Sequence, residues 1–186
     1  IRNGDDNLAK SFLEKIALTE RGDLYRELVM DAGLEYLLKD KPEVAYTYFR
    51  EVLTFESDEN SAFAELYLGN YNAAEMAFET LVKENPHDSK LQAGLAISKF
   101  KNEKQSEANE LIQQLEKQRE PYQFGTLDYA LAQYYAVVND ENAMYHHLMK
   151  AVAAGHRYKP HTFQNDIFFK KYKDTKKFNQ IMTFWH

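Results

Sequence analysis

Apolar residues recur along this chain at the three- and four-residue spacing of amphipathic helices, and short polar stretches separate the runs. The first run holds Leu8, Phe12 and Ile16, and the last holds Phe178 and Ile181. Between them, the same spacing predicts helices over about 23–38, 42–53, 61–68, 71–84, 91–100, 107–115, 127–138 and 142–154. No stretch alternates with a period of two for long enough to indicate a strand, so the pattern predicts an all-α fold.

The breaks between these runs carry residues that favour turns and helix ends. Pro42 suits the first turn of a helix, where its missing N–H needs no partner. Residues 160–173 have the pattern of a loop with one short helix, and Asp174 is expected to cap a final helix through Met182. Helices of this length joined by turns this short pack as antiparallel neighbours.

Small residues return at a regular interval in this helical pattern. Four alanines open successive amphipathic runs at intervals of 29, 34 and 35 residues: Ala45, Ala74, Ala108 and Ala143. The first three are each followed four positions later by a large apolar residue: Phe49, Phe78 and Ile112. Self-similarity near ~34 residues indicates an array of stacked helix pairs, in which no single pair buries its own apolar face.

The same residues resemble the tetratricopeptide repeat family, over roughly residues 24–155. The segment 26–57 carries the family pattern most fully, in the order Val29, Ala32, Gly33, Tyr36, Ala45 and Phe49. Weaker units follow at about 58–88, 89–121 and 124–154. The resemblance implies a right-handed α-α superhelix, a solenoid of about four helix pairs with terminal capping helices, typical of bacterial proteins of this kind.

This resemblance also implies a division of the chain. Residues 1–22 are expected to form a capping helix or the second helix of a truncated repeat, with both readings open. Residues 23–155 form the repeat array, and residues 156–186 form a basic C-terminal capping segment. Because the mostly polar residues 1–6 open the chain without an initiating Met, any export signal is expected upstream, and the location stays open between the cytoplasm and the cell envelope.

In the family, the first helix of each pair lines a concave face that holds protein or peptide ligands. The register carries this role onto Met30, Leu34, Leu37, Phe63, Tyr67, Ile97, Phe100, Asp128 and Tyr135. The apolar members of this set equally suit a core between stacked pairs. Family members that clamp a ligand carboxylate use Lys, Asn and Arg, whereas the corresponding positions here are Met30, Leu34, Glu59, Phe63, Ala93 and Ile97. Such a surface favours an amphipathic helix or an extended hydrophobic peptide.

Charge divides unevenly along the 186 residues, whose formal net charge is −6. Residues 150–186 hold eight Lys or Arg and two acids, while residues 1–149 hold 15 bases and 27 acids. The lysines at 170–177 alternate with aromatic residues, a pattern that nucleic-acid-binding segments share. The acidic remainder of the chain disfavours phosphate contacts, and favours pairing of the basic segment with acidic helices of the same chain or of a second copy.

Motifs for catalysis, metals and cofactors are not evident. The chain has no cysteine and no Gly-rich phosphate loop, nucleophile elbow or H-E-x-x-H pattern. His146, His147, His156 and His161 form a loose cluster, but adjacent histidines on a helix point in different directions and chelate poorly. No apolar run approaches the ~18 residues of a bilayer span.

The sequence therefore predicts a non-catalytic scaffold that binds a protein or peptide on its concave face, without a cofactor or metal. Two alternatives remain open from the sequence. One is an accessory or regulatory domain of a larger enzyme or sensor whose active part precedes Ile1. The other is a self-associating structural protein, a homo-oligomer in which the basic segment meets the acidic body.

Overall fold

The computed structural model describes residues 11, 23–55, 57–155 and 161–183. The helix predicted around 8–16 and the capping segment 1–22 lie outside this set, apart from residue 11. Within the described ranges the chain forms nine α-helices and one 3-10 turn, with no strand: α2 (Asp23–Leu38), α3 (Pro42–Val52), α4 (Glu59–Leu68), α5 (Tyr71–Glu84), α6 (Ser89–Lys101), α7 (Gln105–Lys117), α8 (Thr126–Val138), α9 (Glu141–Ala153), η1 (Ile167–Phe169) and α10 (Lys176–Met182). The prediction of an all-α fold is confirmed.

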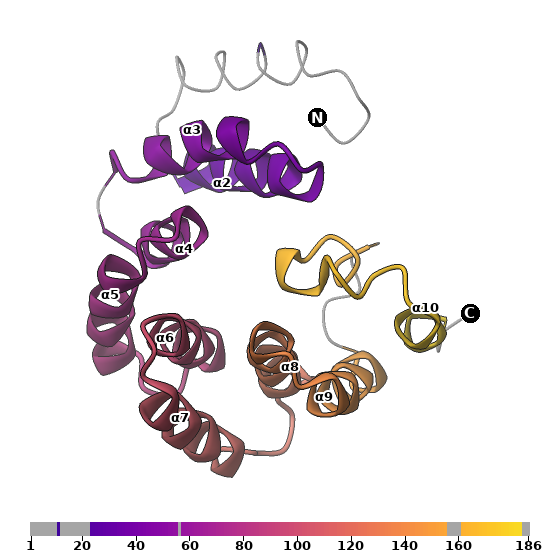
Figure 1. Cartoon of the computed structure of the whole chain (residues 1–186). Helices are drawn as coiled ribbons and strands as arrows, with labels where there is room; N and C mark the ends of the chain where they lie inside the picture. Colours follow the sequence, from indigo (N-terminus) through magenta and orange to yellow (C-terminus); the bar gives the residue numbers. More distant parts are fainter. Residues whose placement is uncertain (1–10, 12–22, 56, 156–160, 184–186) are drawn as a thin grey trace. The chain divides into compact units, whose positions relative to one another are not determined.

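The chain divides into two compact units, residues 1–77 and 78–186, with α5 running across the boundary. In the first unit, α2 and α3 pack against each other, and α4 contacts both. In the second unit, α6 and α7 form such a pair, and α8 contacts both. α9 then pairs with α8, while η1 packs on α8 and α10 packs on α9 (Figure 1).

Local chemistry sets the helix ends. Asp58 caps α4: its side chain accepts a hydrogen bond from the Ser61 amide, and the Ser61 hydroxyl accepts one from the Asp58 amide. α4 stops at Gly69, whose φ of 82° lies in the left-handed region that glycine tolerates. The last helix is capped by Thr175 rather than by the expected Asp174, because the Thr175 hydroxyl accepts from the Phe178 amide.

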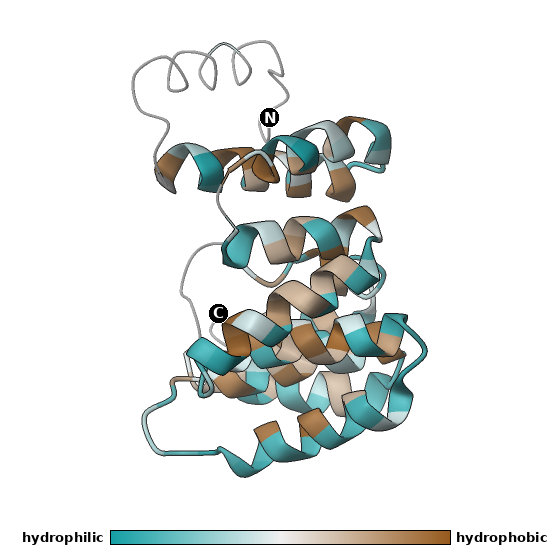
Figure 2. Ribbon diagram, turned by 90° about the vertical axis from the view of Figure 1, so that its left-hand side faces the viewer, coloured by the Kyte–Doolittle hydropathy of each residue, from teal (hydrophilic) through white to brown (hydrophobic). Residues whose placement is uncertain are grey.

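Three of the four alanines that recur along the sequence lie in the core. Ala45, Ala74 and Ala108 are fully buried, and Ala143 is half-buried. The helices carry apolar stripes toward their neighbours: α7, the lowest helix in both views, is hydrophilic apart from a few apolar turns (Figure 2). Its buried residues are Ala108, Ile112 and Leu115.

Two glycines allow even closer contact between helices. A Cβ on Gly33 would overlap the Phe49 ring, and a Cβ on Gly94 would lie 2.6 Å from two ring carbons of Phe78. Both phenyl rings are fully buried. The absence of a side chain at these two positions is therefore what lets each ring approach the helix backbone so closely.

We expect Gly94→Ala to destabilise the protein despite the higher helix propensity of alanine. Propensity favours the substitution by about 1 kcal/mol, but overpacking against a buried ring costs about 1–3 kcal/mol. Urea unfolding followed by circular dichroism should show a net loss. The double variant Gly94→Ala/Phe78→Leu should lose less than the sum of the single losses, because the smaller side chain makes room for the methyl group. Simple additivity would show that the ring does not oppose the Cβ.

Candidate functional site

The residues that the resemblance assigns to a ligand-binding face fall into two groups. Four of them are buried: Met30, Phe63, Ile97 and Asp128. The other five are half-buried: Leu34, Leu37, Tyr67, Phe100 and Tyr135. They lie on α2 and α4 of the first unit and on α6 and α8 of the second unit.

The half-buried aromatic members of this set already have packing partners. The Tyr67 ring lies 5.4 Å from Phe49 and 6.0 Å from Phe63, measured between centroids. The Phe100 ring meets the edge of Tyr134 at 6.4 Å. These rings bridge neighbouring helices within their units, which is the packing role that the sequence left open for them.

A buried polar network surrounds Asp128 on α8. Arg119 donates to both carboxylate oxygens, at 2.6 and 2.8 Å. Nδ1 of His147 lies 2.8 Å from Oδ1, and because a carboxylate only accepts, Nδ1 carries the proton. Lys150 Nζ is 3.7 Å from the same oxygen. This Asp128 network ties the α7–α8 connection to α9.

The network continues on the far side of the imidazole. The Tyr135 ring stacks on His147 at 5.4 Å and 7° between planes, and its hydroxyl donates to Glu116 at 3.2 Å. Burial, together with the charge and hydrogen bond of Glu116, raises the pKa of Tyr135 to about 12. The phenol is therefore a neutral donor at ordinary pH, and the groups pair with one another rather than with solvent.

The ionisation of Asp128 follows from competing effects. Burial alone would raise its pKa, but hydrogen bonds from Arg119 and His147, with the charges of Arg119 and Lys150, outweigh burial and hold the pKa well below its usual range. Sequence reasoning missed this network. The available signal was His147 itself, since it stands four residues after Ala143, where Ala45, Ala74 and Ala108 are followed by large apolar residues.

We expect Asp128→Asn to lower the free energy of unfolding by roughly 1–3 kcal/mol at neutral pH, because the positive groups lose their charged acceptor.

A carboxylate with a depressed native pKa stabilises the fold above its ordinary pKa of about 4, and that stability is lost as the pH falls further. Wild type should therefore lose more stability than Asp128→Asn between about pH 5 and pH 2. Urea unfolding across this range measures the difference. Asp174→Asn, at an exposed carboxylate, is the control; equal acid losses in Asp128→Asn and wild type would contradict the assignment.

The C-terminal segment, residues 161–183, folds back on α8 and α9. Asp166 accepts hydrogen bonds from the Tyr129 hydroxyl, from Gln133 Nε2 at 2.7 Å and from the Phe168 amide at 2.8 Å. Burial of the carboxyl group nonetheless raises the pKa of Asp166 above its ordinary value. Close by, the Tyr145 and Thr175 hydroxyls lie 2.7 Å apart, which joins α9 to the start of α10.

The aromatic residues of this segment form a core. Phe163, Phe169, Tyr172 and Phe178 are buried together with Met144, Leu148 and Val152 of α9. The aromatic residues that alternate with lysines around 168–178 therefore pack against α8 and α9. Three of these rings are buried and so cannot stack on nucleic-acid bases. Lys171 hydrogen-bonds to Asn139 and lies over the Tyr172 ring.

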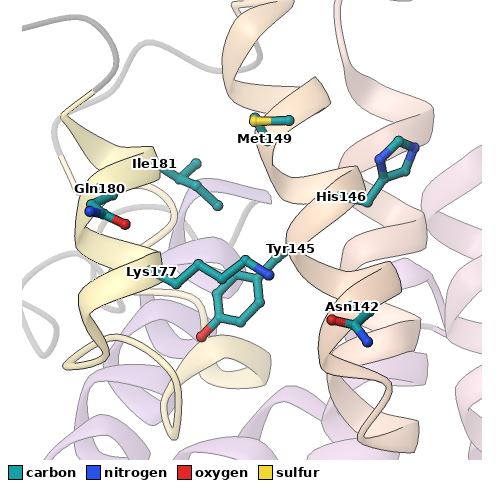
Figure 3. Close-up of a pocket in the computed structure, with 7 residues that line it drawn as sticks. All are labelled: Asn142, Tyr145, His146, Met149, Lys177, Gln180 and Ile181. Carbon is teal, nitrogen blue, oxygen red and sulfur yellow. The ribbon is translucent and has the colours of Figure 1, made fainter.

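α9 and α10 leave a pocket of about 380 Å³ between them (Figure 3). Asn142, Tyr145, His146 and Met149 line it from α9, spaced so that they share one helix face. Lys177, Gln180 and Ile181 line it from α10.

The floor and the rim of this pocket differ in character. Tyr145 and Ile181 are buried and form an apolar floor, while Met149 is 47% exposed at the edge. The Lys177 ammonium lies 4.5 Å from the centroid of the Tyr145 ring, where a cation is attracted to the π face. Figure 3 shows Lys177 and Ile181 reaching from α10 toward α9. The pocket thus joins apolar surface to hydrogen-bond donors and a positive charge.

The histidine cluster does not assemble a metal site in the described part of the chain. His147 hydrogen-bonds to Asp128, and the His146 ring meets the His147 ring edge-on at 5.1 Å between centroids. His156 lies outside the described residues. Across the residues that the structure describes, no group of three or more His, Asp or Glu could hold a metal ion.

Searches for relatives give no assignment: no known protein family, curated protein or solved structure matches the chain. The described helices include none with both the length and the hydropathy needed to cross a membrane.

We expect Tyr129→Phe to loosen the C-terminal segment, because it removes a donor from the enclosed Asp166 carboxylate. Hydrogen–deuterium exchange should accelerate about tenfold in residues 161–183, the cost of one hydrogen bond to a charged group. Exchange in α2 and α3 should not change. Tyr122→Phe is the matched control, since Tyr122 is 86% exposed. Unchanged exchange in the segment would mean that this contact does not hold it on α8.

Proposed function

We propose that this chain is a non-catalytic protein-binding module built from stacked helix hairpins, in the manner of tetratricopeptide repeats. One observation carries the proposal: the same packing recurs in both units. α4 contacts both helices of the α2–α3 pair, and α8 contacts both helices of the α6–α7 pair. Stacking of this kind, in which each new helix rests on the preceding pair, is how helical repeat proteins extend their core.

The contacts at small residues support the same reading. Gly33 beside Phe49 and Gly94 beside Phe78 each place a buried ring against a residue without a side chain. The fully buried alanines at 45, 74 and 108 add three further small residues to the core. A superhelical solenoid is the arrangement that such repeated pairs favour, and it exposes long surfaces suited to peptides and protein segments.

A non-catalytic role is supported by what the ionisable groups contact. Asp128 and His147 resemble an acid–base pair in spacing, but both are buried, and the carboxylate is held by Arg119 as well. The other nitrogen of His147 faces Glu116 at 3.7 Å. A general base must reach the proton that it abstracts from a substrate. These groups instead reach each other.

The pocket between α9 and α10 is the binding surface that the described residues support best. Four of the nine residues expected on a ligand-binding face are buried, and the aromatic ones among the rest pack on other rings. The α9–α10 pocket instead opens to solvent beside an exposed methionine. We propose that a protein segment inserts an apolar side chain there.

Photo-crosslinking tests this proposal. A photoreactive amino acid replaces Met149 at the pocket, and a second version of the chain carries it at Gln113, which is exposed on α7. After irradiation in an extract, mass spectrometry identifies the crosslinked segments. We expect a discrete partner at Met149 and none at Gln113. Absence of a discrete partner at both positions would count against a binding module, and a partner at Gln113 alone would move the site away from the pocket.

A further inference from the structure

We propose that the α9–α10 pocket binds an acidic peptide segment that inserts one large apolar side chain, such as Phe or Leu, between the two helices. This inference rests on the proposed binding function and adds the chemistry of the partner. It follows from the shape of the floor, from the charges at the rim and from what the neighbouring lysines contact.

The floor fits a single large side chain. Tyr145 and Ile181 provide buried apolar surface from opposite sides, and Met149 extends that surface to the edge. A volume of about 380 Å³ lies at the lower end of the range for ligand pockets. Methionine adapts its shape readily, which suits it to accommodating a partner side chain at a binding surface.

The rim favours negative charge. None of the seven lining residues carries a carboxylate, and the polar ones present amide, imidazole and ammonium donors. Lys177 places its ammonium beside the floor, over the Tyr145 ring. A carboxylate next to the inserted side chain would therefore meet the Lys177 ammonium at the rim. Such complementarity steers encounter and selects partners.

A peptide fits these features better than a nucleic acid. Stacking on bases would require exposed rings beside the lysines, but Phe169, Tyr172 and Phe178 are buried in the core of the segment. Lys171 already contacts Asn139 and Tyr172. The remaining combination, one apolar cavity with the Lys177 ammonium beside it, matches an acidic segment with an apolar anchor.

Methyl NMR of the whole chain tests the inference directly. The probe is a short synthetic peptide with one central Phe flanked by Glu and Asp, compared with a peptide in which Lys replaces every acid and one in which Ala replaces Phe. We expect only the acidic Phe peptide to shift the Met149 and Ile181 methyl signals, with no shift at Met30. Binding should weaken as salt rises, because exposed charges are screened.

Charge variants separate the pocket from general attraction. Lys177→Glu should weaken binding of the acidic peptide about tenfold or more, and Gln180→Glu should weaken it as well. Lys117→Glu, at an exposed position on α7, makes the same change of charge as Lys177→Glu away from the pocket. It should leave the affinity for the acidic peptide within about twofold of wild type. The dispersion of methyl signals reports whether each variant is folded. Equal losses in the Lys177 and Lys117 variants, or equal binding of the basic peptide, would overturn the inference.

Two further probes separate other occupants of the pocket. If octanoate shifts the same methyl signals at concentrations where the acidic peptide does not, the pocket is a site for small carboxylates and the inference fails. If sedimentation shows a salt-sensitive dimer that the acidic peptide does not displace, a second copy is the occupant and the inference also fails. A discrete photo-crosslinked partner whose contacting segment is not acidic would leave the binding function standing and refute only the partner chemistry.

Discussion

Contact between an aromatic ring and a residue with no side chain sets the distance between helices in both units. Phe49 lies on Gly33, and Phe78 lies on Gly94. Because neither helix of a pair can bury its apolar face alone, the third helix must approach both, as α4 and α8 do. Ala45, Ala74 and Ala108 are fully buried as well. The core therefore depends on a few positions where a larger side chain would not fit.

One polar exception interrupts this apolar packing. At the last hairpin, the position that carries Phe49, Phe78 and Ile112 in earlier pairs is His147, and the buried Asp128 supplies its partner. Buried hydrogen bonds to a carboxylate such as Asp128 add little net stability over an apolar core, but they are costly to break. These directional hydrogen bonds fix how α9 lies on α8, and α9 in turn provides one wall of the pocket.

The sequence predicts the helices well, since apolar periodicity and turn residues are local signals. The start of α3 at Pro42 and the end of α4 at Gly69 both lie where their chemistry places them. The cap of α10 was assigned one residue early, because Asp174 and Thr175 are both good capping residues and only backbone geometry chooses between them.

The candidate site was harder to predict from sequence. Register on a helix says which residues share a face, but not whether that face meets solvent or another helix. The register places Ile97 and Asp128 on a candidate binding face, and both are buried. The pocket combines residues of α9 with residues more than twenty positions later on α10, and their proximity depends on how the C-terminal segment folds back. No local pattern encodes that contact.

The burial of Phe163, Phe169 and Phe178 affects whether further helix hairpins can pack on α8 and α9. A hairpin that ends in a bare apolar face can accept another hairpin, from the same chain or from a neighbour, and so propagate into a fibre. Here the residues after α9 occupy that face, and Tyr129 and Gln133 hold Asp166 against α8. The C-terminal segment therefore covers apolar surface of α8 and α9 that a further hairpin could otherwise contact.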